Sequence, residues 1–234
     1  MRRSLALAGA LSLLLALSAA CTGDRAEAPG GAAESGPASL PEADGLLRTA
    51  ADELRSVRSA RFAVTTDGSA TLLDIRSAEG VITAEGEAEG TARLSQAGEP
   101  LRLSFVVKGE SLYVNGLTDG WQRLPLSVAA TIYDPSALLS ADRGIANLVA
   151  TASGSTEARE SVDGVPAYRI RGTLPGAALS TLAPGVDGDV VGTLWIGVDR
   201  PLLHRVTFPV PGGSGTVTVT FSDYDAPVTI RTPR

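Results

Sequence analysis

Apolar residues recur at helical spacing where the folded part of the chain begins. Six of them follow a spacing of three to four positions: Leu46, Leu47, Ala50, Ala51, Leu54 and Val57. Glu42 and Asp44 lie just before or among them, where negative charge favours the positive end of a helix dipole. The spacing predicts an amphipathic helix that begins at Pro41.

Beyond this helix the apolar period changes to two, which is typical of strands. The clearest run is Leu101 to Lys108, where apolar residues alternate with mostly polar ones. The same alternation predicts further strands around Phe62/Val64, Ala92/Leu94, Leu112/Val114, Tyr168/Ile170, Leu194/Ile196/Val198 and Val217/Val219/Phe221. Turn signals separate the runs, among them Gly109-Glu110, Asp119-Gly120, Asp163-Gly164 and Gly212-Gly213.

Two shorter helical stretches interrupt the predicted strands. Asp134 and Pro135 suit the cap and the first position of a helix. The apolar side of that stretch consists of Leu138, Leu139, Ile145, Leu148 and Val149, with a break near residues 143–144. A second stretch covers Ala177 to Leu182. About ten strands and three or four helices in one domain predict an α+β fold with a single, largely antiparallel sheet.

An open sheet of this width twists and curls. We expect it to form a half-barrel around the helices, with an apolar concave wall. The covering segments are rich in small residues, namely Ala130, Ala137, Ala141, Ala146 and Ala150. Helices with such small side chains would leave an apolar cavity of the kind that ligands occupy. A well-packed core without a cavity fits the same pattern equally well.

The first 20 residues have the three parts of a signal peptide. Arg2 and Arg3 supply the positive charge, an apolar run extends from Leu5 to Leu17, and small residues follow. The run has 13 residues, whereas spanning a bilayer takes about 20. Residues 1–20 are therefore predicted to be removed on export.

Cys21 is the only cysteine and directly follows this segment. The residues before it resemble a bacterial lipobox, with Ala19 and Ala20 in place and Ser18 where leucine is usual. We expect acyl chains on Cys21 to anchor the protein on the extracytoplasmic side of the cell membrane. The alternative is an ordinary secretory signal cut near Ala20, which would leave an unmodified cysteine.

Residues 21–40 are rich in Gly, Ala, Pro, Ser and acidic residues, a composition that predicts a flexible linker. Its mean reach is about 25 Å. Residues 41–234 form the predicted binding domain. Without Arg2 and Arg3, the mature chain has 18 of the 20 Lys and Arg residues against 26 Asp and Glu, a net charge of −8. This charge argues against a nucleic-acid partner.

The sequence offers little for catalysis. His204 is the only histidine and lies in a strand-like run, so a structural role is expected. A Gly-x-Ser-x-Gly elbow is missing, since residues 108–112 lack its second glycine, and no second histidine or cysteine could complete a transition-metal site. We therefore expect a protein that is not an enzyme and has no metal or cofactor; a Ser/His/Asp triad would have to use His204.

Several motifs resemble those of the LppX/LprA/LprF/LprG family of actinobacterial envelope lipoproteins, most of all its LprG branch. They are Ser59-Ala60, Phe105-Val106-Val107, Leu112-Tyr113, Ile132-Tyr133-Asp134-Pro135, Leu138-Leu139, Gly144-Ile145-Ala146-Asn147-Leu148 and Thr193-Leu194-Trp195-Ile196. The resemblance implies a curled sheet with helices on its concave side, similar in plan to the LolA and LolB lipoprotein carriers. It also implies an apolar cavity for multiply acylated lipids or glycolipids, such as triacylglycerol or lipoarabinomannan, which the protein would carry across the envelope.

The resemblance further implies a membrane efflux transporter as a partner. For this chain, the resemblance implies a lipid-binding wall on two strands and the covering helices. Its residues would be Ala92, Leu94, Leu103, Phe105, Val107, Leu138, Leu139, Ile145, Leu148 and Val149. Each of these residues could equally belong to a solid core. In that case the protein would be an anchored interaction module or a regulator of a transporter.

Overall fold

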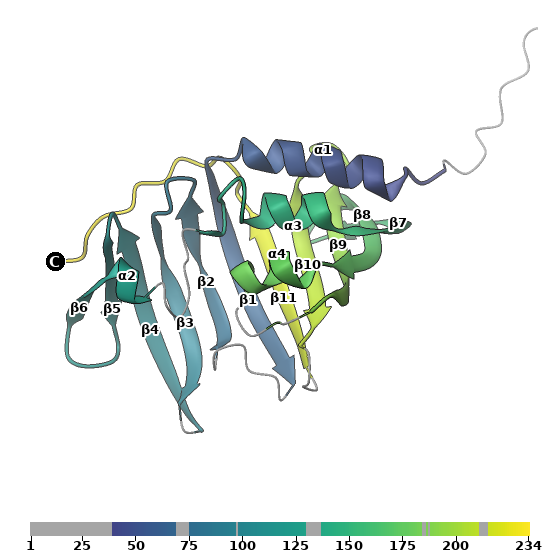
Figure 1. The fold of residues 1–234 in the computed structure, drawn as a ribbon. Coiled ribbons are helices and arrows are strands. Elements are labelled where there is room, and N and C mark those ends of the chain that lie inside the picture. The colour runs from purple at the N-terminus through teal and green to yellow at the C-terminus, as the bar shows by residue number, and fades with distance from the viewer. Residues whose placement is uncertain are drawn as a thin grey trace, which may run out of the picture. The chain divides into compact units, whose positions relative to one another are not determined.

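A single antiparallel sheet of eleven strands dominates the described part of the chain (Figure 1). The computed structural model describes residues 39–68, 75–96, 98–129, 137–183, 186, 188–210 and 215–234. The strands are β1 (Ser59–Gly68), β2 (Ile75–Thr83), β3 (Ala88–Gln96), β4 (Glu99–Lys108), β5 (Ser111–Asn115), β6 (Trp121–Pro125), β7 (Ser153–Val162), β8 (Val165–Leu174), β9 (Val190–Gly197), β10 (Leu203–Pro209) and β11 (Gly215–Ser222).

The strands form two meanders that join in the middle of the sheet. Their order is β6-β5-β4-β3-β2-β1-β11-β10-β9-β8-β7, so every neighbouring pair is consecutive in sequence except β1 and β11. That pair is in register from Arg61 opposite Ser222 to Gly68 opposite Gly215. The sheet is curled and does not close, because β6 and β7 remain as its two edges.

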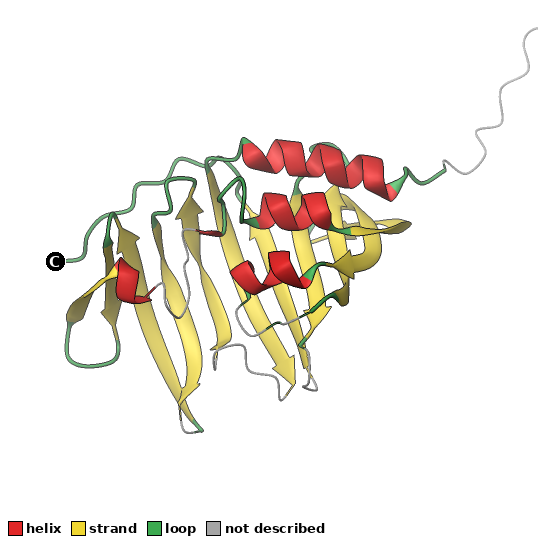
Figure 2. Cartoon of the chain, in the orientation of Figure 1, coloured by secondary structure: helices red, strands yellow, loops and turns green. Residues whose placement is uncertain are grey.

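Helices cover one half of the concave face. The helices are α1 (Ala43–Arg55), α2 (Leu126–Ala129), α3 (Ile145–Thr151) and α4 (Gly176–Leu182). α1 packs on α3, and α3 packs on α4. Figure 2 shows these three helices over the half of the sheet that contains β7 to β11, while the short α2 packs on β5 and β6. The concave face of β2 to β4 is consequently the less covered half.

Small side chains allow α1 to pack closely. Ala50 and Ala51 are fully buried beside Leu47 and Leu54 on the same face of α1. Val149 of α3 is also fully buried in this core. The interior on this side is therefore filled by the three helices and by the strands beneath them.

Turn chemistry sets the register of the hairpins. Asp163 and Gly164 join β7 to β8 with positive φ angles of 50° and 85°. Val162 pairs with Val165 across this two-residue loop. Asp-Gly suits such a turn, because both central residues must adopt positive φ. The turn predicted at this site is confirmed.

The predicted fold class is confirmed, with differences in detail. The sheet has eleven strands where about ten were expected. Leu138 and Leu139 lie in turns, and helix α3 begins only at Ile145, after the predicted break. Asp134 and Pro135 lie outside the described residues, as do residues 1–20 of the predicted signal peptide, Cys21 and most of the predicted linker. No helix of the described segments is long and apolar enough to cross a bilayer.

Candidate functional site

An apolar cavity of about 400 Å³ lies between the concave face of the sheet and the helices. Every described residue that lines it has an apolar side chain, except Thr66. The wall is formed by Phe62, Val64, Thr66, Ile75, Ala78, Ile82, Ala88, Ala92, Leu103, Phe105, Val107, Leu112, Val114, Leu124, Val128, Leu138, Ile145, Leu148, Leu179, Leu182, Ala183, Val206, Phe208, Val217, Val219 and Phe221. Its volume lies within the range of about 300–1,000 Å³ that is usual for ligand pockets.

Strand periodicity explains how the sequence builds this wall. On β1, Phe62, Val64 and Thr66 face the cavity, while Arg61 and Ala63 face the opposite side of the sheet. Side chains alternate between the two faces along each strand. Antiparallel registers then align the wall residues of neighbouring strands, for example Val64 beside Ala78 and Ala92 beside Leu103.

The structure brings together seven of the ten residues that the resemblance placed in the wall. They are Ala92, Leu103, Phe105, Val107, Leu138, Ile145 and Leu148. Leu94 is half-buried and does not line the cavity, while Leu139 and Val149 are buried in the core. Contact of any of the ten with a lipid stays a prediction.

The sequence did not predict the wall residues that come from strands distant in sequence. Val206 and Phe208 of β10 line the same cavity as Leu112 and Val114 of β5. Their alternation was visible in the sequence, since β5 and the run around Val206 read as strands. The missing information was the strand order, which places β1 beside β11 and so joins the two meanders.

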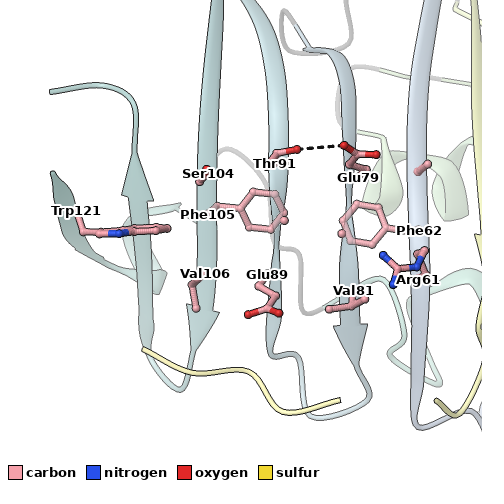
Figure 3. Close-up of a pocket in the computed structure, with 13 residues that line it drawn as sticks. Arg61, Phe62, Glu79, Val81, Glu89, Thr91, Ser104, Phe105, Val106 and Trp121 are labelled. Carbon is pink, nitrogen blue, oxygen red and sulfur yellow. Dashed lines mark hydrogen bonds between the residues drawn. The ribbon is translucent and has the colours of Figure 1, made fainter. Parts of the chain in front are cut away.

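A pair of glycines lies next to two phenylalanines of the cavity wall. Gly80 on β2 lies opposite Gly90 on β3. On its other side Gly80 pairs with Phe62 of β1, and Gly90 pairs with Phe105 of β4. Figure 3 shows the Phe105 ring reaching over β3 and the Phe62 ring reaching over β2. A Cβ at Gly90 would lie 2.9 Å from Cζ of Phe105. The two rings therefore occupy the space that the missing side chains leave.

The opposite face of the same strands is polar. A groove there is lined by Arg61, Glu79, Glu89, Thr91 and Ser104, with Trp121 of β6 at its side (Figure 3). Trp195 also lies on the face away from the cavity, where its Nε1 donates a hydrogen bond of 2.7 Å to Glu160. Both tryptophans thus lie outside the apolar cavity.

His204 packs against residues of the C-terminal segment and of β9. Its ring contacts Tyr224 edge-to-face at 6.0 Å between centroids, and it lies against Gly197. Burial lowers the pKa of His204, while a backbone hydrogen bond at Phe221 and the charge of Asp163 oppose that shift. The Tyr224 hydroxyl donates to the carbonyl oxygen of Leu203. This arrangement fixes the C-terminal segment against β10.

Thr66 is the polar exception in the apolar wall. The residue is 7% exposed, and its Oγ1 has no hydrogen-bond partner among the described residues. The same residues contain no cluster of His, Cys, Asp or Glu that could hold a metal ion. The chemistry that the cavity offers is therefore apolar contact, together with one hydroxyl.

Comparison with known proteins gives the family. The model of the LppX_LprAFG lipoprotein family matches residues 42–230. The chain belongs to this family. It is 35% identical over 207 residues to the lipoarabinomannan carrier protein LprG of Mycolicibacterium smegmatis, with 86% of each chain covered. It is 27% identical to the putative diacylated glycolipid transporter LprF of Mycobacterium bovis, over 96% of this chain and 92% of that one.

Solved structures of family members have the same fold. The crystal structure of LprF from Mycobacterium bovis matches with a TM-score of 0.73 at 25% identity, over 82% of this chain and 96% of that one. The lipoprotein LppX of Mycobacterium tuberculosis matches with a TM-score of 0.62 at 25% identity, over 81% and 98%. The family resemblance inferred from the sequence motifs is confirmed.

Proposed function

We propose that this protein binds acylated lipids or glycolipids in the apolar cavity and carries them across the cell envelope. The observation that carries the proposal is the wall itself, which is apolar at every described position except Thr66. The names of two relatives, a lipoarabinomannan carrier protein and a putative diacylated glycolipid transporter, support the same ligand class.

The size of the wall suits acyl chains. Its strand residues come from eight neighbouring strands of the sheet, in the order β6-β5-β4-β3-β2-β1-β11-β10. Seven spacings of about 4.8 Å give a wall of roughly 34 Å along the curl. The hydrocarbon core of a bilayer is about 30 Å thick, so a chain from one leaflet extends over roughly half of that distance. A wall of this length exceeds the reach of one such chain.

The energetics suit a carrier that must also release its ligand. Moving a methylene group from water into the cavity is favourable by about 0.8 kcal/mol. Moving it from a bilayer into the cavity changes little, because both surroundings are apolar. Loading and release can therefore be nearly balanced, while the polar headgroup remains in water at the cavity mouth.

Attachment to the membrane would keep the carrier close to its source of lipid. We propose that Cys21 carries acyl chains, that residues 21–40 act as a tether, and that the domain works on the extracytoplasmic side. A membrane efflux transporter is the proposed partner of this cycle. The apolar cavity favours this function over that of an interaction module with a solid core.

Lipid transfer between vesicles tests the proposed function. Donor vesicles would contain a fluorescent triacylated glycolipid with a quencher, and acceptor vesicles would contain neither. We expect the transfer rate to rise in proportion to the protein concentration. A rate that stays at the protein-free value over a hundredfold range of concentration would contradict the carrier function.

A further inference from the structure

A buried hydroxyl stands in the otherwise apolar wall of the cavity. Thr66 lies on β1 directly opposite Val217 of β11, and Val64 precedes it on the same face. All three residues line the cavity. Thr66 is 93% buried, and its Oγ1 has no partner among the residues that the structure describes. The hydroxyl is therefore buried within the apolar wall of the cavity, without a hydrogen-bond partner among the described residues.

An unpartnered hydroxyl in apolar surroundings is unfavourable, because it has left water without a replacement hydrogen bond. Valine has nearly the same shape and would avoid this penalty. A ligand made only of hydrocarbon could not satisfy the hydroxyl either. A ligand that brings a hydrogen-bond acceptor to this position could satisfy it, and would gain affinity by doing so.

The position of Thr66 indicates which part of a lipid would supply the acceptor. Thr66 lies two residues before the end of β1, where Gly68 pairs with Gly215. From β1 the apolar wall continues through β2, β3, β4 and β5 to Leu124 on β6. Five strand spacings of about 4.8 Å give roughly 24 Å of wall for a chain that starts at Thr66. The carbonyl at the head of an acyl chain would thus lie beside the hydroxyl, with the tail extending along the wall.

We propose that the Oγ1–H of Thr66 donates a hydrogen bond to an ester carbonyl of the bound lipid, so that the cavity prefers ester-linked acyl chains over ether-linked alkyl chains. This inference rests on the proposed function and narrows its ligand class. Thr66 acts here as a specificity-determining residue of the cavity.

The test compares two phosphatidylglycerols that have the same headgroup and 16-carbon chains, one a diester and the other a diether. Each would be titrated into purified full-length protein by displacement of a fluorescent fatty acid. We expect the diester to bind about five- to tenfold more tightly, the range that one hydrogen bond supports. In Thr66→Val this ratio should fall to about one, while Thr66→Ser should retain most of it.

Thr91→Val is the matched control, because Thr91 is a half-buried strand threonine on the opposite face of the sheet. It should keep the wild-type ratio. Equal affinities for the two lipids in the wild-type protein, or a ratio that Thr66→Val leaves unchanged, would overturn the inference but leave the proposed function intact. Failure of both lipids to bind the wild-type protein would overturn the proposed function and this inference together.

Discussion

Enlarging Ala92 to tryptophan should block the cavity without unfolding the domain. Ala92 lies on β3 between Ala78 of β2 and Leu103 of β4, and all three line the cavity. Its side chain is half-buried beside open apolar space, so a larger side chain can enter the cavity and need not displace core residues.

The magnitude follows from contact area. A buried tryptophan covers about 150–250 Å². At about 25 cal/mol per Å², that area corresponds to about 4–6 kcal/mol of apolar contact that a lipid could no longer make with the wall. If only half of it is lost to the ligand, roughly 2–3 kcal/mol, lipid affinity falls by about thirtyfold or more.

Displacement of a fluorescent fatty acid by unlabelled lipid measures this affinity, and thermal unfolding of the same sample checks the fold. Thr91→Trp is the matched control, since it places the same ring on the same strand but on the polar face. We expect only Ala92→Trp to weaken lipid binding. Equal affinities in Ala92→Trp and Thr91→Trp, with both variants folded, would refute the assignment of the cavity as the lipid site.

Three further predictions concern the glycine pair, the half-buried His204 and the predicted anchor. Gly90→Ala should lower the free energy of unfolding by about 1–3 kcal/mol, because its Cβ would lie 2.2 Å from the Glu79 carbonyl oxygen. Gly45→Ala, a helical position with open space around it, should raise the free energy of unfolding by about 1 kcal/mol; urea titration compares the two, and equal effects would contradict the steric argument. Burial lowers the pKa of His204, so the unfolded chain binds more protons, and the free energy of unfolding should fall as pH drops through the unfolded-state value of about 6.5. His204→Gln should show a smaller fall between about pH 7 and pH 5, and equal slopes would argue against this origin. Cys21→Ser should move the protein from the detergent phase to the aqueous phase in detergent phase separation; retention in the detergent phase would count against acylation.

Strand alternation predicted much of the sheet, but it failed where a strand has few apolar residues. β7 is an edge strand whose side chains are mostly exposed, and the apolar residues among them are only Ala158 and Val162. An edge strand with one uncovered face lacks the apolar period that marks a buried strand. β2 was missed for a related reason, since Gly80 interrupts the apolar series between Ala78 and Ile82.

The cavity wall was harder to predict than the sheet. Leu148 lines the cavity while its neighbour Val149 is buried in the core, although both lie on the apolar side of α3. Which of them faces the cavity depends on how α3 rotates as it packs on α1, and helical spacing does not fix that rotation. Leu94 faces the same side as Ala92, one residue pair farther along β3, and does not line the cavity, although its cross-strand partner Ile75 does. The length of a cavity depends on tertiary packing, so periodicity alone could not define where it ends.

Native mass spectrometry of the full-length protein, purified from its own envelope without exchange of lipids, tests the central claim most directly. We expect one acylated lipid per protein in the wild type and a clearly lower occupancy in Ala92→Trp. A wild-type protein that is free of lipid, and that takes up none from added vesicles, would contradict it.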